Sequence, residues 1–118
     1  MCKHVPWIER TFSFDFPAGQ YRELLERLRG GPARVEARTR ALAPALCTRR
    51  LGDKRSIQEH VGHLVDLEPL FSGRLDEFEA GAPVLRAADM RLADMLLFHS
   101  EHDDYHLARI TELIRAPG

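Results

Sequence analysis

The sequence predicts an all-α protein, and three observations lead to this prediction. Apolar residues recur at helical spacing in several long segments, most clearly over Leu92–Ile114. Helix-breaking glycines and prolines cluster between these segments, at Gly30–Pro32 and at Gly81–Pro83. The one short stretch that alternates apolar and polar residues, near the N-terminus, has no second strand with which to pair.

Residues 1–17 are expected to form an extended N-terminal arm. Phe12, Phe14 and Phe16 alternate with polar residues, which is a short-strand pattern, but a single strand cannot form a sheet. We therefore predict that these aromatic side chains pack onto the helices. The alternative is an aromatic lid over a pocket.

The first helix is expected to begin near Ala18 and to continue through Leu28. Gly30–Pro32 should interrupt it, because each glycine costs about 1 kcal/mol inside a helix and proline disfavours the helical state of the residue before it. Since proline suits a first helical turn, a second piece is predicted from Pro32 to Leu42.

Ser56 and Glu59 have the spacing of a capping box, which predicts that a long helix starts there after a polar loop. Pro69 lies inside this helix, so a kink is expected near Val65–Asp66, where a backbone hydrogen bond is lost. The helix should end at Gly81–Pro83. Its apolar face is predicted to contain Ile57, Val61, Leu64, Leu67, Phe71, Leu75 and Phe78.

The composition limits the class of protein. A chain of 118 residues forms one domain, here 1–118, and 44% apolar with 30% charged residues is typical of a soluble globular protein. The net charge of −1 without a basic block argues against nucleic acid, and no apolar run is long enough to cross a membrane. The N-terminus lacks the apolar core of a signal peptide, so a cytoplasmic location is expected. Cys2 and Cys47 lack CxxC spacing and are predicted to be free thiols, with no role assigned.

The final helix is predicted to start around Ala87–Asp89 and to end near Arg115. Its apolar face carries His99, His102 and His106, in the middle of a stripe that would otherwise be core. His102 and His106 are four residues apart, so their imidazoles leave one helix face about one turn apart. Two protein ligands of a single metal ion need this geometry.

His63 is the candidate third ligand. The turn at Gly81–Pro83 should join two helices into an antiparallel hairpin, in which residues equally far from the turn lie side by side. His63 precedes the turn by about 20 residues and the histidine pair follows it by about as many, which at about 1.5 Å per residue is about 30 Å along each arm. His60, one turn earlier, is either an additional ligand or a solvent-facing neighbour.

Three neutral imidazoles suit zinc or nickel, and three protein ligands leave a position open for water or substrate. Imidazole ligands usually donate their second N–H to a carboxylate, for which Glu59, Asp66 and Asp103 are the candidates. In the alternative interpretation, the histidines are ordinary residues with hydrogen-bond partners. Other helical metal motifs fit less well, because the sequence contains neither H-E-x-x-H nor Glu-x-x-His.

Two segments resemble motifs of the DinB-like (YfiT-like) superfamily. Ser56–Asp66, which reads SIQEHVGHLVD, is similar to the start of the family's second helix, where a histidine precedes a leucine. Glu101–Ile110, which reads EHDDYHLARI, resembles the final-helix motif of two histidines four apart, followed by a leucine and an isoleucine. Residues 7–10 and 24–35 also resemble a bacterial branch of this superfamily, so the likeness covers most of the chain.

The resemblance implies a four-helix bundle in up-down-down-up order, with a divalent metal held by one histidine of the second helix and two of the fourth. The matching residues here are His63, His102 and His106, which the hairpin register also selects. Characterised relatives include thiol-dependent transferases and a maleylpyruvate isomerase that use low-molecular-weight thiols. Many others are described only as metal-dependent hydrolases.

The chain departs from the family pattern in two places. Arg55 stands where the family has a tryptophan before the serine, and the segment between the second and final helices is too short for the family's third helix. We therefore expect three main helices and an open apolar groove, whose exposure is unfavourable by about 25 cal/mol per Å². A homodimer, with or without a swapped final helix, would cover this groove.

The leading hypothesis is a divalent-metal enzyme, a thiol-dependent transferase or a hydrolase, that acts on a low-molecular-weight thiol or another small molecule. Candidates for proton transfer are Glu59, Asp103 and Tyr105. Two alternatives belong to other classes: a dimeric metal-binding helical module without turnover, and a helical interaction protein without metal.

Overall fold

The structure, a computed structural model, describes residues 5–83 and 90–117, and all regular secondary structure within these ranges is helical. Two single 3₁₀ turns, η1 (Trp7–Glu9) and η2 (Ala18–Gln20), come first. The α-helices that follow are α1 (Tyr21–Arg29), α2 (Gly31–Thr39), α3 (Pro44–Thr48), α4 (Ile57–Asp66), α5 (Glu68–Glu79) and α6 (Leu92–Arg115). The all-α prediction is confirmed. Among these helices, none has both the length and the apolar character that crossing a membrane requires.

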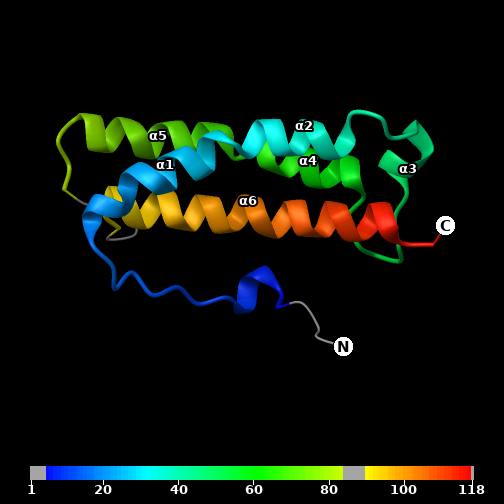
Figure 1. Cartoon of the computed structure of the whole chain (residues 1–118), viewed down its shortest axis with the longest axis horizontal. Helices are drawn as coiled ribbons and strands as arrows, with labels where there is room; N and C mark the ends of the chain where they lie inside the picture. Colours follow the sequence, from blue (N-terminus) through cyan, green and yellow to red (C-terminus); the bar gives the residue numbers. More distant parts are fainter. Residues whose placement is uncertain (1–4, 84–89, 118) are drawn as a thin grey trace.

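The longer helices form three rods that run alongside one another (Figure 1). α1 and α2 make the first rod, α4 and α5 run back as the second, and α6 returns as the third. α6 packs against all four of the other long helices. The antiparallel arrangement predicted for the second rod and the final helix is therefore confirmed.

The first rod is interrupted at the predicted place. α1 ends at Arg29, and α2 begins at Gly31 with proline in its first turn. Gly31 also lets α2 approach α6 closely, since a Cβ atom there would lie 3.0 Å from Oδ2 of Asp103. α2 ends at Thr39, three residues before the predicted end at Leu42.

The second rod also begins and bends as predicted. The Ser56 hydroxyl accepts from the backbone N–H of Glu59, and the Glu59 carboxylate accepts from the backbone N–H of Ser56, so the capping box is complete. α4 ends at Asp66 and α5 begins at Glu68 with Pro69 in its first turn. The missing N–H of this proline explains the break.

One short helix was not predicted. α3, for which no regular structure was predicted, contributes Leu46 to an apolar cluster at one end of the molecule. The following Arg49 donates through Nη2 to the carbonyl oxygens of Leu113 and Ala116, at 2.8 and 3.1 Å. These bonds satisfy carbonyl groups at the end of α6, which ends at Arg115 as predicted. The predicted start at Ala87–Asp89 lies outside the described residues.

The apolar core is divided into two parts. One cluster forms around Met90, Met95 and Leu96 near the start of α6, and the other around Ile57 and Ile110 near its end. Between the clusters, the buried side chains are largely polar: His60, His99, Ser100, His102 and His106. The middle of the bundle is thus a polar site enclosed by apolar ends.

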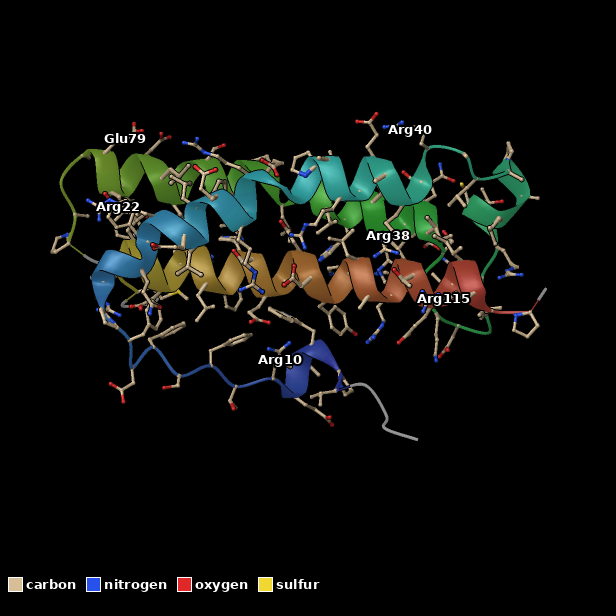
Figure 2. The ribbon with its side chains drawn as sticks, viewed as in Figure 1. Arg10, Arg22, Arg38, Arg40, Glu79 and Arg115 are labelled. Carbon is tan, nitrogen blue, oxygen red and sulfur yellow. The ribbon has the colours of Figure 1, made fainter. Side chains whose placement is uncertain are left out.

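Residues 5–17, the described part of the N-terminal arm, pack along α6, as expected for their aromatic side chains (Figure 1). The rings of Trp7 and Phe12 lie 5.3 and 5.6 Å from the ring of Phe98. Arg10, which follows η1, donates to Glu101 on α6 at 3.1 Å (Figure 2). The arm therefore covers a part of α6 that the other two rods do not cover.

Candidate metal centre

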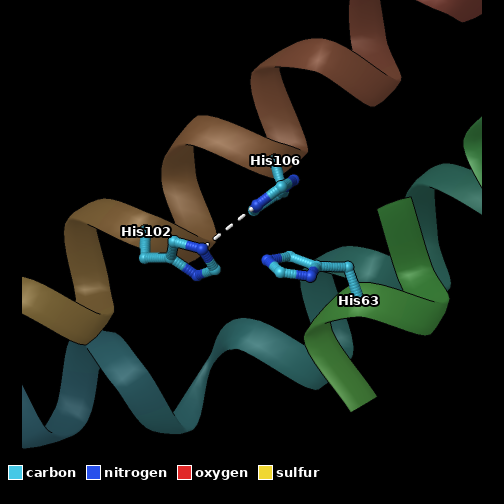
Figure 3. A group of neighbouring side chains, drawn as sticks. All are labelled: His63, His102 and His106. Atoms are coloured by element: carbon cyan, nitrogen blue, oxygen red, sulfur yellow. Dashed lines mark hydrogen bonds between the residues drawn. The ribbon is translucent and has the colours of Figure 1, made fainter. Parts of the chain in front are cut away.

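His63, His102 and His106 converge at one point in the middle of the bundle. One ring nitrogen from each lies within 4.8 Å of the corresponding nitrogens of the other two. The ring of His63 extends from α4 toward the two imidazoles of α6 (Figure 3). The structure therefore brings together, within a single chain, the three histidines that the hairpin register selected.

The spacing of the nitrogens fits a divalent metal. Nε2 of His102 and Nε2 of His106 lie 3.2 Å apart. Two nitrogens bound to one tetrahedral zinc ion at about 2.0–2.1 Å lie about 3.3 Å from each other. A ring nitrogen of His63 lies within 4.8 Å of both, so after a small side-chain movement the three residues would fit a tetrahedral ion with one position open.

The electrostatic environment keeps these imidazoles neutral. Burial lowers the pKa of His106 to about 3, with further lowering from the neighbouring histidines and Arg55. The pKa of His102 falls to about 4, again mainly through burial. Burial and Arg55 also lower the pKa of His63. A metal ion needs the lone pair of a neutral imidazole, so this environment favours coordination near neutral pH.

His60 is buried beside the centre rather than facing solvent, which corrects one of the two expectations for it. Its Nδ1 lies 2.8 Å from Nδ1 of His106, within hydrogen-bond distance. The helical turn between His60 and His63 explains the placement, because both residues leave α4 on the side that faces α6. The ring of His60 thus contacts the candidate ligand His106 on the edge of its ring that carries Nδ1.

The three carboxylates expected to hold the imidazoles do not do so among the described residues. Glu59 accepts from Arg50 Nε at 2.7 Å and from the backbone of Ser56, and these bonds, the one from Arg50 first, lower its pKa to about 2. Asp66 is exposed, and no imidazole donates to it. Asp103 also lacks a hydrogen bond to any imidazole in the described part of the chain.

Asp103 instead lines a pocket of about 200 Å³ between the rods that is partly open to solvent, together with His99 and His102. The rest of the lining is mostly apolar. Burial raises the pKa of Asp103 to about 6, with nearby Asp104 and Glu68 acting in the same direction and Arg34 opposing it. A carboxyl group with this pKa is able to give and take a proton near neutral pH.

His99 belongs to the same helix face but lies outside the group of three. Its Nε2 is 3.1 Å from Nη1 of Arg74, and its ring packs against Phe71. Burial, with Arg74, lowers its pKa to about 4. Cys47 is a half-buried free thiol away from the centre, and Cys2 lies outside the described residues.

Trp7 and Tyr105 cover the side of the centre that faces the N-terminal arm. The ring of Trp7 lies 4.9 Å from that of His102 and 5.8 Å from that of Tyr105. The ring of Tyr105 in turn lies 5.3 Å from that of His106. The arm therefore packs onto the helix and also shields one of the candidate ligands.

Comparison with known proteins adds no relative. No protein-family model matches the chain, and neither the curated proteins nor the solved structures include a significant match. The class that the fold and the site define is therefore an all-α bundle with a three-histidine cluster in its core.

Proposed function

We propose that the protein is a divalent-metal enzyme in which His63, His102 and His106 hold zinc or nickel. The observation that carries this proposal is the convergence of three neutral imidazoles in a cluster that, within residues 5–83 and 90–117, includes no acidic ligand. Borderline metals such as zinc and nickel prefer imidazole nitrogen, whereas magnesium and calcium prefer oxygen.

The proposed reaction class is that of a thiol-dependent transferase or a hydrolase. The resemblance of two motifs to the DinB-like superfamily supports it, since the histidines of these motifs are the ones that converge. The three rods also run in alternating directions, as the first, second and fourth helices of such a bundle do. A bound ion with an open position supplies Lewis-acid chemistry toward a water, thiol or carbonyl oxygen.

The chain's own residues would orient the ligands and handle protons. His60 fixes the orientation of His106 through the Nδ1 contact. Of the candidates for proton transfer, Glu59 is held by Arg50 and Ser56, which leaves Asp103 and Tyr105. Asp103 is the stronger candidate because its pKa is raised to about 6 and it lines a cavity with His102.

A second candidate function is a metal-binding module without turnover. It is favoured by one observation: no carboxylate among the described residues bonds directly to a histidine of the cluster. Activity against pairs of low-molecular-weight thiols and electrophiles, measured with and without chelator, separates the two. Chelator-sensitive turnover supports the enzyme, and its absence across the panel supports the module.

We also propose that the protein forms a homodimer. Val65 and Leu70, on the second rod, are 62% and 47% exposed and offer an apolar surface to a second copy. A swapped final helix is not needed to complete the centre, because all three histidines converge within one chain. Sedimentation equilibrium at micromolar concentration should detect a dimer that Val65→Ser with Leu70→Ser weakens. A monomer at all concentrations would contradict the proposal.

The experiment that tests the metal centre measures metal content in tag-free protein. One equivalent of zinc or nickel is expected in the wild type, and less than a tenth of it in His63→Ala, His102→Ala and His106→Ala, because each variant removes one of three ligands. His99→Gln is the matched control, since it changes a buried histidine of the same helix outside the cluster. Full occupancy in all three alanine variants would refute the proposed site.

A further inference from the structure

A second cavity, of about 440 Å³, opens beside the histidine cluster between residues 51–55 and the second half of α6. His60 and His106 line it, so the cavity reaches an imidazole that belongs to the cluster. We call it the basic cavity because its lining includes three cationic side chains, those of Lys54, Arg55 and Arg109.

Two of these cations are not compensated by acidic groups. Arg109 donates through Nη2 to Oε1 of Glu112 at 2.8 Å, and Glu112 is the one acidic residue in the lining. Lys54 and Arg55 are exposed, and within the described residues their side chains have no ion-pair partner. The mouth of the basic cavity therefore carries unpaired positive charge.

The positive charge of Arg55 acts electrostatically on the histidines of the cluster. After the larger effect of burial, Arg55 contributes to lowering the pKa values of all three cluster histidines and of His60. An anion bound to Arg55 would consequently lie within electrostatic range of the candidate metal.

The remaining wall of the cavity is apolar. Leu51 and Leu113 contribute aliphatic surface, and the ring of Tyr105 packs under the guanidinium of Arg109 at 5.0 Å. Binding sites for small molecules combine such an apolar wall with a few convergent polar groups that fix orientation. Here the polar groups are cationic, and their natural complement is a carboxylate or a phosphate.

We propose that the basic cavity binds a small organic anion, with an apolar body and a carboxylate or phosphate group, and orients it toward the three-histidine cluster. Lys54 and Arg55 hold the anionic group, while the leucines contact the body. The inference deepens the proposed function, on which it rests, by naming the class of substrate that the centre receives.

Calorimetric titration with three probes of similar size tests this inference. Benzoate and phenyl phosphate carry the two candidate anionic groups, and benzyl alcohol has the same body without charge. Both zinc-loaded and metal-free protein are titrated. At least one anion should bind, and benzyl alcohol should bind roughly tenfold more weakly or not at all. The stronger of the two anions identifies the group that the cavity prefers.

Substitutions locate the binding. Lys54→Gln with Arg55→Gln should weaken the anion at least about tenfold, because two charged contacts are lost. Arg55→Glu, which reverses the charge, should abolish binding. Arg38→Gln is the matched control, since Arg38 is an exposed arginine on α2 that does not line the cavity, and it should leave affinity unchanged.

Failure of the cavity and failure of the metal centre give different results. If anion affinity is the same in the wild type and in Arg55→Glu, or if neither anion binds at millimolar concentration, the basic cavity is refuted even when zinc is retained. If zinc does not bind but the metal-free protein binds an anion through Arg55, the metal centre is refuted and the cavity stands.

Discussion

His60 and His106 face each other through their Nδ1 atoms at 2.8 Å, although they belong to different rods. On its other edge, His106 places Nε2 at 3.2 Å from Nε2 of His102. A metal bound to Nε2 of His106 leaves the ring proton on Nδ1, which then donates to His60. His60 must accept through Nδ1 and carry its own proton on Nε2. With a metal bound, an imidazole would thus fill the role that a carboxylate was expected to fill.

This relationship predicts that His60→Leu lowers metal affinity about 10–100-fold, as is usual when the group that orients a histidine ligand is lost. His60→Gln should recover part of the affinity, because its amide oxygen is able to accept the same proton. Competition with a chromophoric chelator measures both. Affinities equal to that of the wild type in both variants would show that His60 does not orient His106.

The lowered pKa values of the buried histidines predict acid sensitivity of the metal-free protein. Burial depresses the folded-state pKa of His106 to about 3, and those of His99 and His102 to about 4, from the ordinary histidine value of 6.5. The unfolded chain therefore binds more protons below pH 6.5, so stability is complete above this pH and falls as pH decreases toward about 4. Thermal unfolding in the presence of chelator measures this fall. A melting temperature that does not change between these pH values would contradict the burial of neutral imidazoles.

Asp103 predicts the opposite dependence. Its folded-state pKa is raised by burial to about 6 from 3.8, so its contribution to stability is complete below 3.8 and is lost as pH rises through about 6. Asp103→Asn should therefore stabilise the metal-free protein by about 1 kcal/mol above this pH, after allowance for partial solvent screening, and by much less in acid. Urea unfolding of both proteins near pH 4 and near pH 8 gives the difference. A difference that is independent of pH would refute the raised pKa.

Asp104 ties α6 to the first rod. Its carboxylate accepts from Arg34 at 2.7 Å and also from Arg27, and although burial raises its pKa, the two arginines lower it overall. Asp104→Ala should destabilise the protein by about 1–2 kcal/mol, because two half-buried guanidinium groups lose their shared partner. Glu36→Ala is the control: it breaks an exposed pair with Arg40, and its effect through that pair should stay below about 0.5 kcal/mol. Equal effects of the two substitutions in urea unfolding would contradict the role of Asp104.

Much of the fold could be predicted because its determinants are local. The capping box of Ser56 and the break before Pro69 follow from chemistry within a few residues along the chain. The proximity of His63 to His102 and His106 could be predicted from the lengths of the two helices and the position of the turn between them. α3 was missed because five residues are too few to show an apolar period.

The environment of the cluster could not be predicted, because it depends on contacts between rods. Glu59 and Asp66 were predicted to accept hydrogen bonds from the histidines because they lie close to His63 in the sequence. In the structure, Glu59 accepts instead from Arg50, and Asp66 is exposed. The contact of His60 with His106 depends on how α4 is rotated about its own axis. The spacing of residues along the sequence does not fix this rotation closely enough to predict the contact. Spacing along the chain did not single out Arg55 as a binding residue, because its place with His106 in one cavity lining depends on how the rods pack.

An anomalous-difference map from crystals of tag-free protein grown with zinc tests the central claim most directly. Measured at the zinc absorption edge, it should show one peak about 2 Å from a ring nitrogen of each of His63, His102 and His106. A map with these three imidazoles in place and no peak between them, or with zinc bound only elsewhere, would contradict the account.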